Sequence, residues 1–162
     1  MPDLRIVPAQ ERDIPLLLQL IRGLAEYERL THMLEATEER LRATLFGDRP
    51  AAEVLLAYQD DECVGYALYF TTYSTFLAKP GLYLEDVFVI PNARRRGIGH
   101  SILKWLAAIA RERDYGRMEW SVLDWNTPAI DFYRKIGAKV LDEWRICRMT
   151  GDAIVNLADS VV

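Results

Sequence analysis

The segment Arg94–Gly99 combines three consecutive arginines with a Gly-x-Gly pair. It follows an apolar stretch and precedes residues whose hydrophobic positions recur at helical spacing. Guanidinium groups suit phosphate oxygens, and glycines let the first N–H groups of a helix approach an anion closely. The spacing therefore predicts an anion site, such as one for a pyrophosphate, where a helix begins. A solvated basic turn, in which the glycines serve only helix entry, is the alternative interpretation.

Two side chains on either side of this segment have types suited to proton transfer. Glu85 lies at the end of an otherwise apolar stretch, and a carboxylate there could act as a general base. Tyr133 follows Asn126 by about two helical turns, so both could face one cleft, where a phenol could act as an acid. The alternative for Glu85 is a strand-edge carboxylate paired with an arginine, and the alternative for Tyr133 is a core aromatic residue. Asn126 could serve only as a helix cap.

The hydrophobic periodicity around these residues predicts alternating strands and helices. We expect strands at 4–7, 52–58, 63–71, 82–90, 118–123 and 140–149. We expect helices capped by Asp13 and Thr37, a third from Gly97 to about Arg113 and a fourth starting at Asn126. Residues 72–81 read as a loop. The order β-α-α-β-β-β-α-β-α-β predicts one mixed sheet with helices on its faces, in a single domain of residues 1–162.

Composition narrows the classes of partner. A net charge of -4 and a pI near 5.3 argue against nucleic acid and suit a cationic substrate. The sequence has no apolar run near the ~20 residues that cross a bilayer, and its histidines and cysteines have no metal-site spacing. Cys63 and Cys147 lie in apolar runs, which favours buried free thiols in a reducing compartment. We therefore expect a cytoplasmic protein with no metal, no nucleic acid and no membrane partner.

The chain resembles the GNAT superfamily of N-acetyltransferases. Arg94–Gly99 fits the acetyl-CoA motif of that family, Arg/Gln-x-x-Gly-x-Gly/Ala, without a mismatch. Four more segments are similar to the spermidine/spermine (diamine) N-acetyltransferase subfamily: Leu24–Glu28, Tyr83–Val89, Trp125–Asn126 and Phe132–Ala138. Within it, Tyr73–Thr75 and Leu123–Asn126 are more similar to the thialysine-acetylating branch. The resemblance covers nearly the whole chain and implies a mixed α/β fold, with a mostly antiparallel twisted sheet and helices on both faces.

The resemblance implies direct transfer of an acetyl group from acetyl-CoA to an amine. Glu85 would be the water-mediated base and Tyr133 the acid that protonates the CoA sulfur. The N–H groups of residues 87–89 would bind the acetyl carbonyl, with a bulge there that splays this strand from residues 118–123. The cofactor-binding residues would be Val87, Phe88, Val89, Arg94, Arg95, Arg96, Gly97, Ile98, Gly99, His100, Asn126 and Tyr133.

The substrate end is less specific in sequence, because ordinary surface charges would look the same. The implied substrate-binding residues are Tyr27, Glu28, Glu85, Glu119, Trp120, Ser121 and Glu143. Where polyamine acetylases carry an acidic residue and a Trp, this chain has Ser74 and Phe76, and its insertion at 142–144 is shorter. The missing acid favours a shorter amine or the side-chain amine of an amino acid over a long polyamine.

The expected partner is a small-molecule amine, and the resemblance implies a homodimer whose C-terminal strands cross between protomers. Two other functions fit the same motif. One is acetylation of a protein or peptide N-terminus or lysine, which would need an open groove. The other is a non-catalytic regulatory domain that binds acyl-CoA, against which Glu85 and Tyr133 count.

Overall fold

The computed structural model describes residues 3–161. The chain groups into two compact units, Met1–Ser121 and Val122–Val162. The expected single domain over residues 1–162 stays a prediction.

A five-stranded sheet forms the first unit, with its strands in the order β1-β2-β3-β4-β5. Pairing is antiparallel from β1 to β4, and β5 joins β4 in parallel. This confirms the mixed, mostly antiparallel sheet. The strands are β1 Leu4–Pro8, β2 Glu53–Gln59, β3 Glu62–Ser74, β4 Lys79–Val89 and β5 Met118–Trp120.

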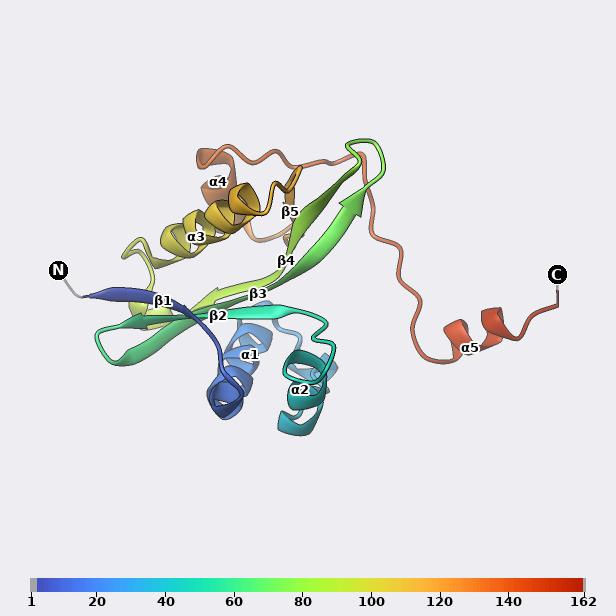
Figure 1. The fold of residues 1–162 in the computed structure, drawn as a ribbon, viewed down its shortest axis with the longest axis horizontal. Coiled ribbons are helices and arrows are strands. Elements are labelled where there is room, and N and C mark those ends of the chain that lie inside the picture. The colour runs from blue at the N-terminus through green and yellow to red at the C-terminus, as the bar shows by residue number, and fades with distance from the viewer. Residues whose placement is uncertain (1–2, 162) are drawn as a thin grey trace. The chain divides into compact units, whose positions relative to one another are not determined.

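Helices cover both faces of this sheet, as expected. Figure 1 shows α1 (Ile14–Glu28) and α2 (Glu38–Leu45) on one face and α3 (Ile98–Glu112) on the other. Three short 3-10 helices join these elements: η1 Glu11–Asp13, η2 Thr31–Met33 and η3 Pro91–Ala93. Each long helix carries an apolar stripe that must be buried, so a sheet with two faces accommodates both.

A hydrophobic cluster fills the α1/α2 side of the sheet. Leu17 and Leu41 of the helices meet Leu56, Tyr66 and Phe88 of the strands there. On the other side, α3 approaches β4 most closely and buries one stripe. That stripe consists of Ile98, Ile102, Leu103, Leu106, Ile109 and Ala110. The two layers hold β4 between them, and the candidate site lies on β4.

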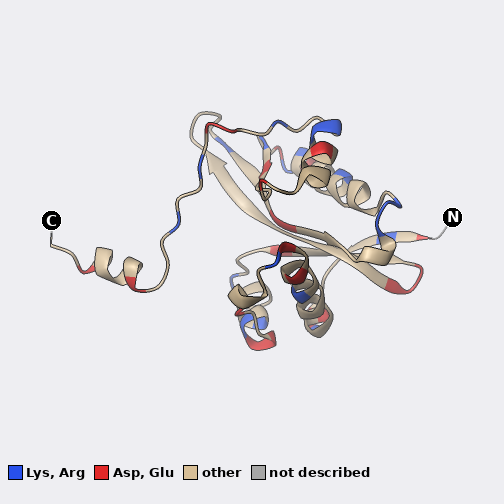
Figure 2. Cartoon of the chain, turned by 180° about the vertical axis from the view of Figure 1, so that it is seen from behind, with Lys and Arg blue, Asp and Glu red and all other residues tan. Residues whose placement is uncertain are grey.

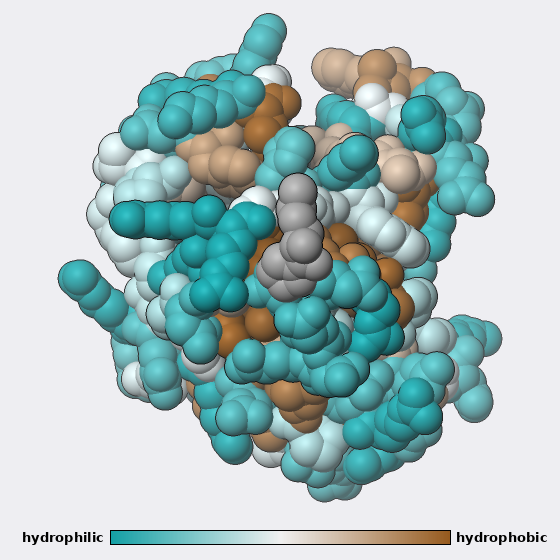
Figure 3. Space-filling model, turned by 90° about the vertical axis from the view of Figure 1, so that its left-hand side faces the viewer, coloured by the Kyte–Doolittle hydropathy of each residue, from teal (hydrophilic) through white to brown (hydrophobic). Residues whose placement is uncertain are grey.

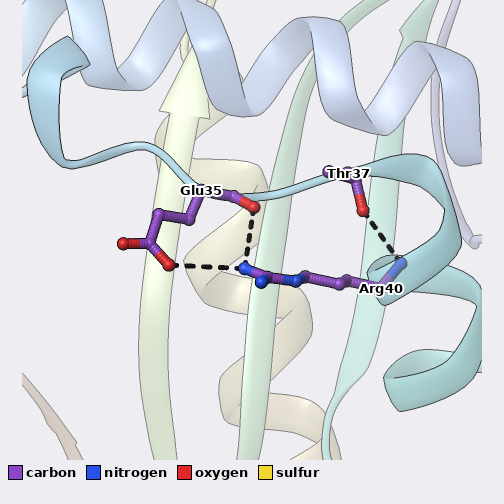
Figure 4. Close-up of polar contacts among 3 residues, drawn as sticks. All are labelled: Glu35, Thr37 and Arg40. Atoms are coloured by element: carbon purple, nitrogen blue, oxygen red, sulfur yellow. Dashed lines mark hydrogen bonds and ion pairs between the residues drawn. The ribbon is translucent and has the colours of Figure 1, made fainter. Parts of the chain in front are cut away.

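Local hydrogen bonds fix where α2 begins. The Thr37 hydroxyl accepts from the main-chain N–H of Arg40 at 3.2 Å, which confirms the expected cap. Arg40 also donates from Nη1 to the carbonyl and the carboxylate of Glu35, so the side chain ties the preceding loop to the helix (Figure 4). Asp13 behaves differently, because its carboxylate accepts from the N–H of Gln10 at 2.8 Å and caps no N–H of α1.

The side of the protein seen in Figure 3 is mainly hydrophilic, with smaller hydrophobic areas between polar side chains. This agrees with a sequence in which 27% of residues are charged. None of the helices within residues 3–161 is both long enough and apolar enough to span a membrane.

The second unit contains α4 (Thr127–Lys135) and α5 (Asp152–Ala158), joined by a segment without regular structure (Figure 1). The strand expected at 140–149 is wrong, because no residue there pairs with another strand in the described chain. An apolar run has strand propensity but forms a strand only beside a partner edge. The sequence interpretation also missed α5, and Cys147 is an exposed free thiol, whereas Cys63 is half-buried.

The loop expected at 72–81 is also wrong. Strands β3 and β4 continue through it and pair as far as Ser74 with Lys79, which leaves a short turn. The Ser74 hydroxyl accepts from the N–H of Leu77 at 3.2 Å and is buried, so it closes that turn from inside. Phe76 at the tip is fully exposed. The strand expected to reach residue 123 ends earlier, at Trp120.

Candidate active site

Glu85 is the extra residue of a β-bulge. Leu68 of β3 lies opposite Asp86, whereas the next residue, Tyr69, lies opposite Leu84, so Glu85 has no partner on β3. Its side chain is exposed. A bulge leaves one residue outside the ladder and re-aims its side chain, which is a common device beside functional sites. The predicted base is therefore placed by an interruption of the sheet.

The bulge also changes which face of the sheet the side chains of β4 point to. After it, Asp86 and Phe88 share the α1 face with Tyr66, which belongs to the cluster under α1 and α2. Before it, Leu84 shares a face with Tyr69, which lines a surface hollow together with Trp105 of α3. Strict alternation would place Leu84 and Phe88 on one face. One inserted residue therefore lets β4 supply apolar side chains to both sides of the sheet, the α1/α2 side and the α3 side.

Three carboxylates gather around the bulge. Asp86 accepts a hydrogen bond from the buried Tyr66 hydroxyl at 3.0 Å. Burial is the main reason that the pKa of Asp86 is raised to about 6; this hydrogen bond acts to lower the pKa, and the charges of Glu85 and Glu28 act with burial to raise it. Burial likewise raises the pKa of Glu28, with a further contribution from Glu85. The α1 end and the bulge together make a region of negative potential suited to an ammonium group.

A second polar group lies on the β4–β5 pair. Glu119 is opposite Tyr83 in the parallel ladder, and its carboxylate is 2.7 Å from Nε of Arg117. The Tyr83 hydroxyl is 3.0 Å from the Ser121 hydroxyl. Trp120 pairs with Leu84 and is half-buried. Of the predicted substrate residues here, Glu119 is already neutralised by a neighbouring cation.

The ladder between β4 and β5 is short. It runs from Leu82/Met118 to Leu84/Trp120, and no β4–β5 pair follows within the described residues. The main chain of residues 87–89 is therefore free of β5, as the prediction of splayed strands requires. The bulge itself lies at Glu85, earlier than the expected 87–89, because the β3–β4 register shifts there.

The turn before α3 has the features of an anion site. Gly97 adopts the left-handed conformation at φ +81 and occupies the N-cap position, and no side chain within the described chain caps α3. A Cβ on Gly97 or Gly99 would meet open space, so an anion could approach the first N–H groups. Ile98 is buried beneath the turn, whereas Arg95, Arg96 and His100 are exposed. Figure 2 shows the basic residues on this turn and the acidic residues on β4 before it.

Three predicted residues lie in the second unit. Asn126 is buried and accepts from the N–H of Ala129 at 3.4 Å, so its role as the cap of α4 is confirmed. Tyr133 lies on α4, half-buried, with its ring centroid 5.6 Å from that of Phe132. Glu143 is exposed in the segment after α4. Their catalytic and binding roles stay predictions.

Sequence reasoning missed Tyr66, Asp86 and Arg117. A signal for Asp86 was available, because it follows Leu82 and Leu84 and precedes Phe88 at alternating positions of an apolar strand. A carboxylate at such a position is buried and needs a donor. Nothing local pointed to Tyr66 as that donor, since it is 20 positions away in sequence.

Known proteins are similar to this chain in sequence and in fold. Residues 17–138 match the acetyltransferase (GNAT) family. A thialysine N-epsilon-acetyltransferase of Bos taurus is 40% identical over 93% of this chain and 94% of its own length. An L-ornithine N5-acetyltransferase of Arabidopsis thaliana is 35% identical over 93% of this chain and 86% of its own. Among solved structures, an integron cassette protein from the V. cholerae mobile metagenome has a TM-score of 0.80 and 27% identity, covering 97% of this chain and 98% of its own.

The family match and the relatives named as N-acetyltransferases identify the chain as an amine acetyltransferase. The chain belongs to the GNAT family.

Proposed function

We propose that the chain transfers the acetyl group of acetyl-CoA to the primary amine of a small cationic substrate by direct attack. The observation that supports this most is the β-bulge, which exposes Glu85 near Glu28 and Asp86. The strand with this bulge, β4, leads to the turn before α3 that has the features of an anion site. When bound, the thioester supplies an activated acetyl group.

Glu85 removes a proton from the amine through a water. A primary amine with a pKa of about 10.4 is protonated at pH 7, which is about 3.4 pH units below that pKa. Its deprotonation therefore costs roughly 4.6 kcal/mol without assistance. The neighbouring carboxylates Glu28 and Asp86 hold the ammonium form before the proton leaves. Tyr133 donates the proton that the departing CoA sulfur needs.

The pyrophosphate is bound by the first N–H groups of α3 and by exposed arginines of the preceding turn. Gly97 and Gly99 keep that backbone open to it. The N–H groups of residues 87–89 that point away from β3, beyond the end of the β4–β5 ladder, bind the acetyl carbonyl. Asn126 and His100 contribute further contacts to the cofactor.

The amine is short, and we favour the side-chain amine of an amino acid. The two relatives described above are named for thialysine and ornithine acetylation. Ser74 is occupied in closing its own turn and offers no carboxylate to a distant ammonium. Glu119 is paired with Arg117, which weakens attraction for a second cationic group.

A homodimer is also proposed. Large apolar side chains of the C-terminal segment are exposed in the single chain, including Trp144 at 75% and Ile146 at 70%. Such a surface is more typical of an interface than of a monomer. Analytical ultracentrifugation tests this, and a monomer at micromolar concentration would contradict it.

Incubation with acetyl-CoA and an amine panel, while free thiol is measured, tests the function. The panel contains thialysine, ornithine, lysine, putrescine, spermidine and an N-terminal peptide. Thiol release with the amino acids is expected, and Glu85→Gln should lower kcat/KM about 100-fold or more. Release only with the peptide would favour a protein acetyltransferase. Binding of acetyl-CoA without release would favour a regulatory domain.

A further inference from the structure

The three arginines of the turn differ in their surroundings. Arg95 and Arg96 are exposed, and Nη1 of Arg96 donates to the Gln59 side chain at 2.9 Å. Arg94 is half-buried instead. A side chain that serves a bound anion presents its donors outward, so the half-buried position of Arg94 and the inward direction of its Nε point to another role.

Arg94 contacts both α1 and β4. Its Nε donates to the main-chain carbonyl of Val89 at 2.8 Å. The guanidinium lies over the ring of Tyr27 in the last turn of α1, 4.6 Å from the centroid, and 5.5 Å from the ring centroid of Phe88. Such cation–π contacts strengthen when the cation is partly removed from water.

Phe88 is itself fixed against α1. A Cβ added to Gly23 would be 3.0 Å from Cζ of Phe88, so the helix and strand are in close contact at this point. The Arg94 side chain, which belongs to the basic turn, therefore contacts both the end of α1 and the end of β4. The next residue after Tyr27 is Glu28, whose carboxylate interacts electrostatically with Glu85.

We infer that Arg94 is a positioning residue that fixes the last turn of α1, and with it Tyr27 and Glu28, against the strand carrying Glu85. The arginines of the turn therefore have two different roles. Arg95 and Arg96 face the pyrophosphate, and Arg94 sets the geometry of the amine side. The inference rests on the proposed function for its consequence in catalysis, but the contact itself can be tested without turnover.

Arg94→Lys tests the division of tasks. Lysine keeps the charge but lacks both the Nε donor and the planar group that stacks on Tyr27. We expect KM for the amine to rise about tenfold, the size of one cation–π contact, with kcat much less affected. The dissociation constant for acetyl-CoA should stay within about twofold, an energy change well under 1 kcal/mol.

Two further variants provide the comparison. The double variant Arg95→Ala, Arg96→Ala should weaken acetyl-CoA binding more than it changes KM for the amine. Arg22→Lys is the matched control, because Arg22 is an exposed arginine of the same α1 helix, and all its constants should be unchanged. Weaker acetyl-CoA binding in Arg94→Lys, with an unchanged amine KM, would overturn the inference.

A double-variant cycle of Arg94→Lys and Tyr27→Leu, followed by urea unfolding, is independent of catalysis. If the two side chains form one contact, their losses of unfolding midpoint will be less than additive, and Tyr27→Phe, which keeps the ring, will retain the coupling. Additive losses would overturn the inference whether or not the protein turns over. Absence of turnover with every amine would contradict the proposed function alone, since the cycle still decides the contact.

Discussion

The two units of the chain differ in how they bury apolar residues. The first unit packs both faces of its sheet, and residues such as Leu56, Tyr66 and Leu106 are fully buried. In the described part of the second unit, residues 122–161, Asn126 is the only buried residue. Trp144 and Ile146 of the second unit are also large hydrophobic residues, yet they lie exposed. Apolar composition therefore makes a core only where a second layer faces it.

The largest expected effect comes from a matched pair of isoleucines, one in each unit. Ile102→Ala removes a side chain that is 1% exposed and should lower the free energy of unfolding by about 2–5 kcal/mol. Ile146→Ala removes one that is 70% exposed and should cost less than about 0.5 kcal/mol in dilute solution. Urea titrations measure both.

Repeating the Ile146→Ala titration at high protein concentration sharpens this comparison. In a homodimer the cost should grow with concentration, because assembly stabilises the folded state by mass action. A cost above about 1 kcal/mol that is independent of concentration would break the comparison, since it would require burial within one chain.

The next effect concerns Asp86, the half-buried carboxylate beside the bulge. Asp86 has a pKa of about 6, above the value near 4 of an unfolded chain, so the native state holds a proton that the unfolded chain has lost. Stability from this group is therefore present below pH 4 and falls as pH rises to 6. Asp86→Asn should remove this loss, gaining at most about 3 kcal/mol at pH 8 relative to pH 4.

Unfolding of wild type and variant at both pH values measures this difference. An Asp86→Asn variant whose stability follows the wild type at every pH would show that the Asp86 carboxylate is well solvated.

A smaller effect tests the second unit's predicted catalytic side chain. Tyr133→Phe keeps the ring that packs near Phe132 but removes the hydroxyl. We expect kcat to fall about tenfold, the lower range for loss of a general acid, while acetyl-CoA binding is retained. Steady-state kinetics and calorimetry measure the two quantities. An unchanged kcat would remove the acid role from Tyr133.

The smallest effect is on substrate choice. Arg117→Gln leaves Glu119 without its 2.7 Å partner, so the carboxylate can attract a second ammonium. We expect the ratio of kcat/KM for putrescine to that for ornithine to rise about threefold, as for a partly exposed ion pair. Glu119→Gln in the same background should reverse the change. A ratio that does not respond to either variant would place Glu119 outside the amine site.

Local patterns predicted much of the fold and part of the site. The Thr37 and Asn126 caps depend on residues within three positions of each other, so the sequence contains the whole interaction. The left-handed Gly97 before an amphipathic helix is equally local. The expected strand at 140–149 failed for the opposite reason, because strand formation depends on an edge that no local pattern specifies.

The sequence by itself determined the Thr37 and Asn126 caps, the glycine turn and the apolar stripes that require a two-faced sheet, because each is set by neighbours along the chain. Only the tertiary structure decided that Glu85 is the bulged residue, that Tyr66 holds Asp86 and that Arg94 lies between Tyr27 and Val89. These contacts join elements distant in sequence, and their geometry depends on the register of β3 against β4 and on how closely α1 packs on the sheet.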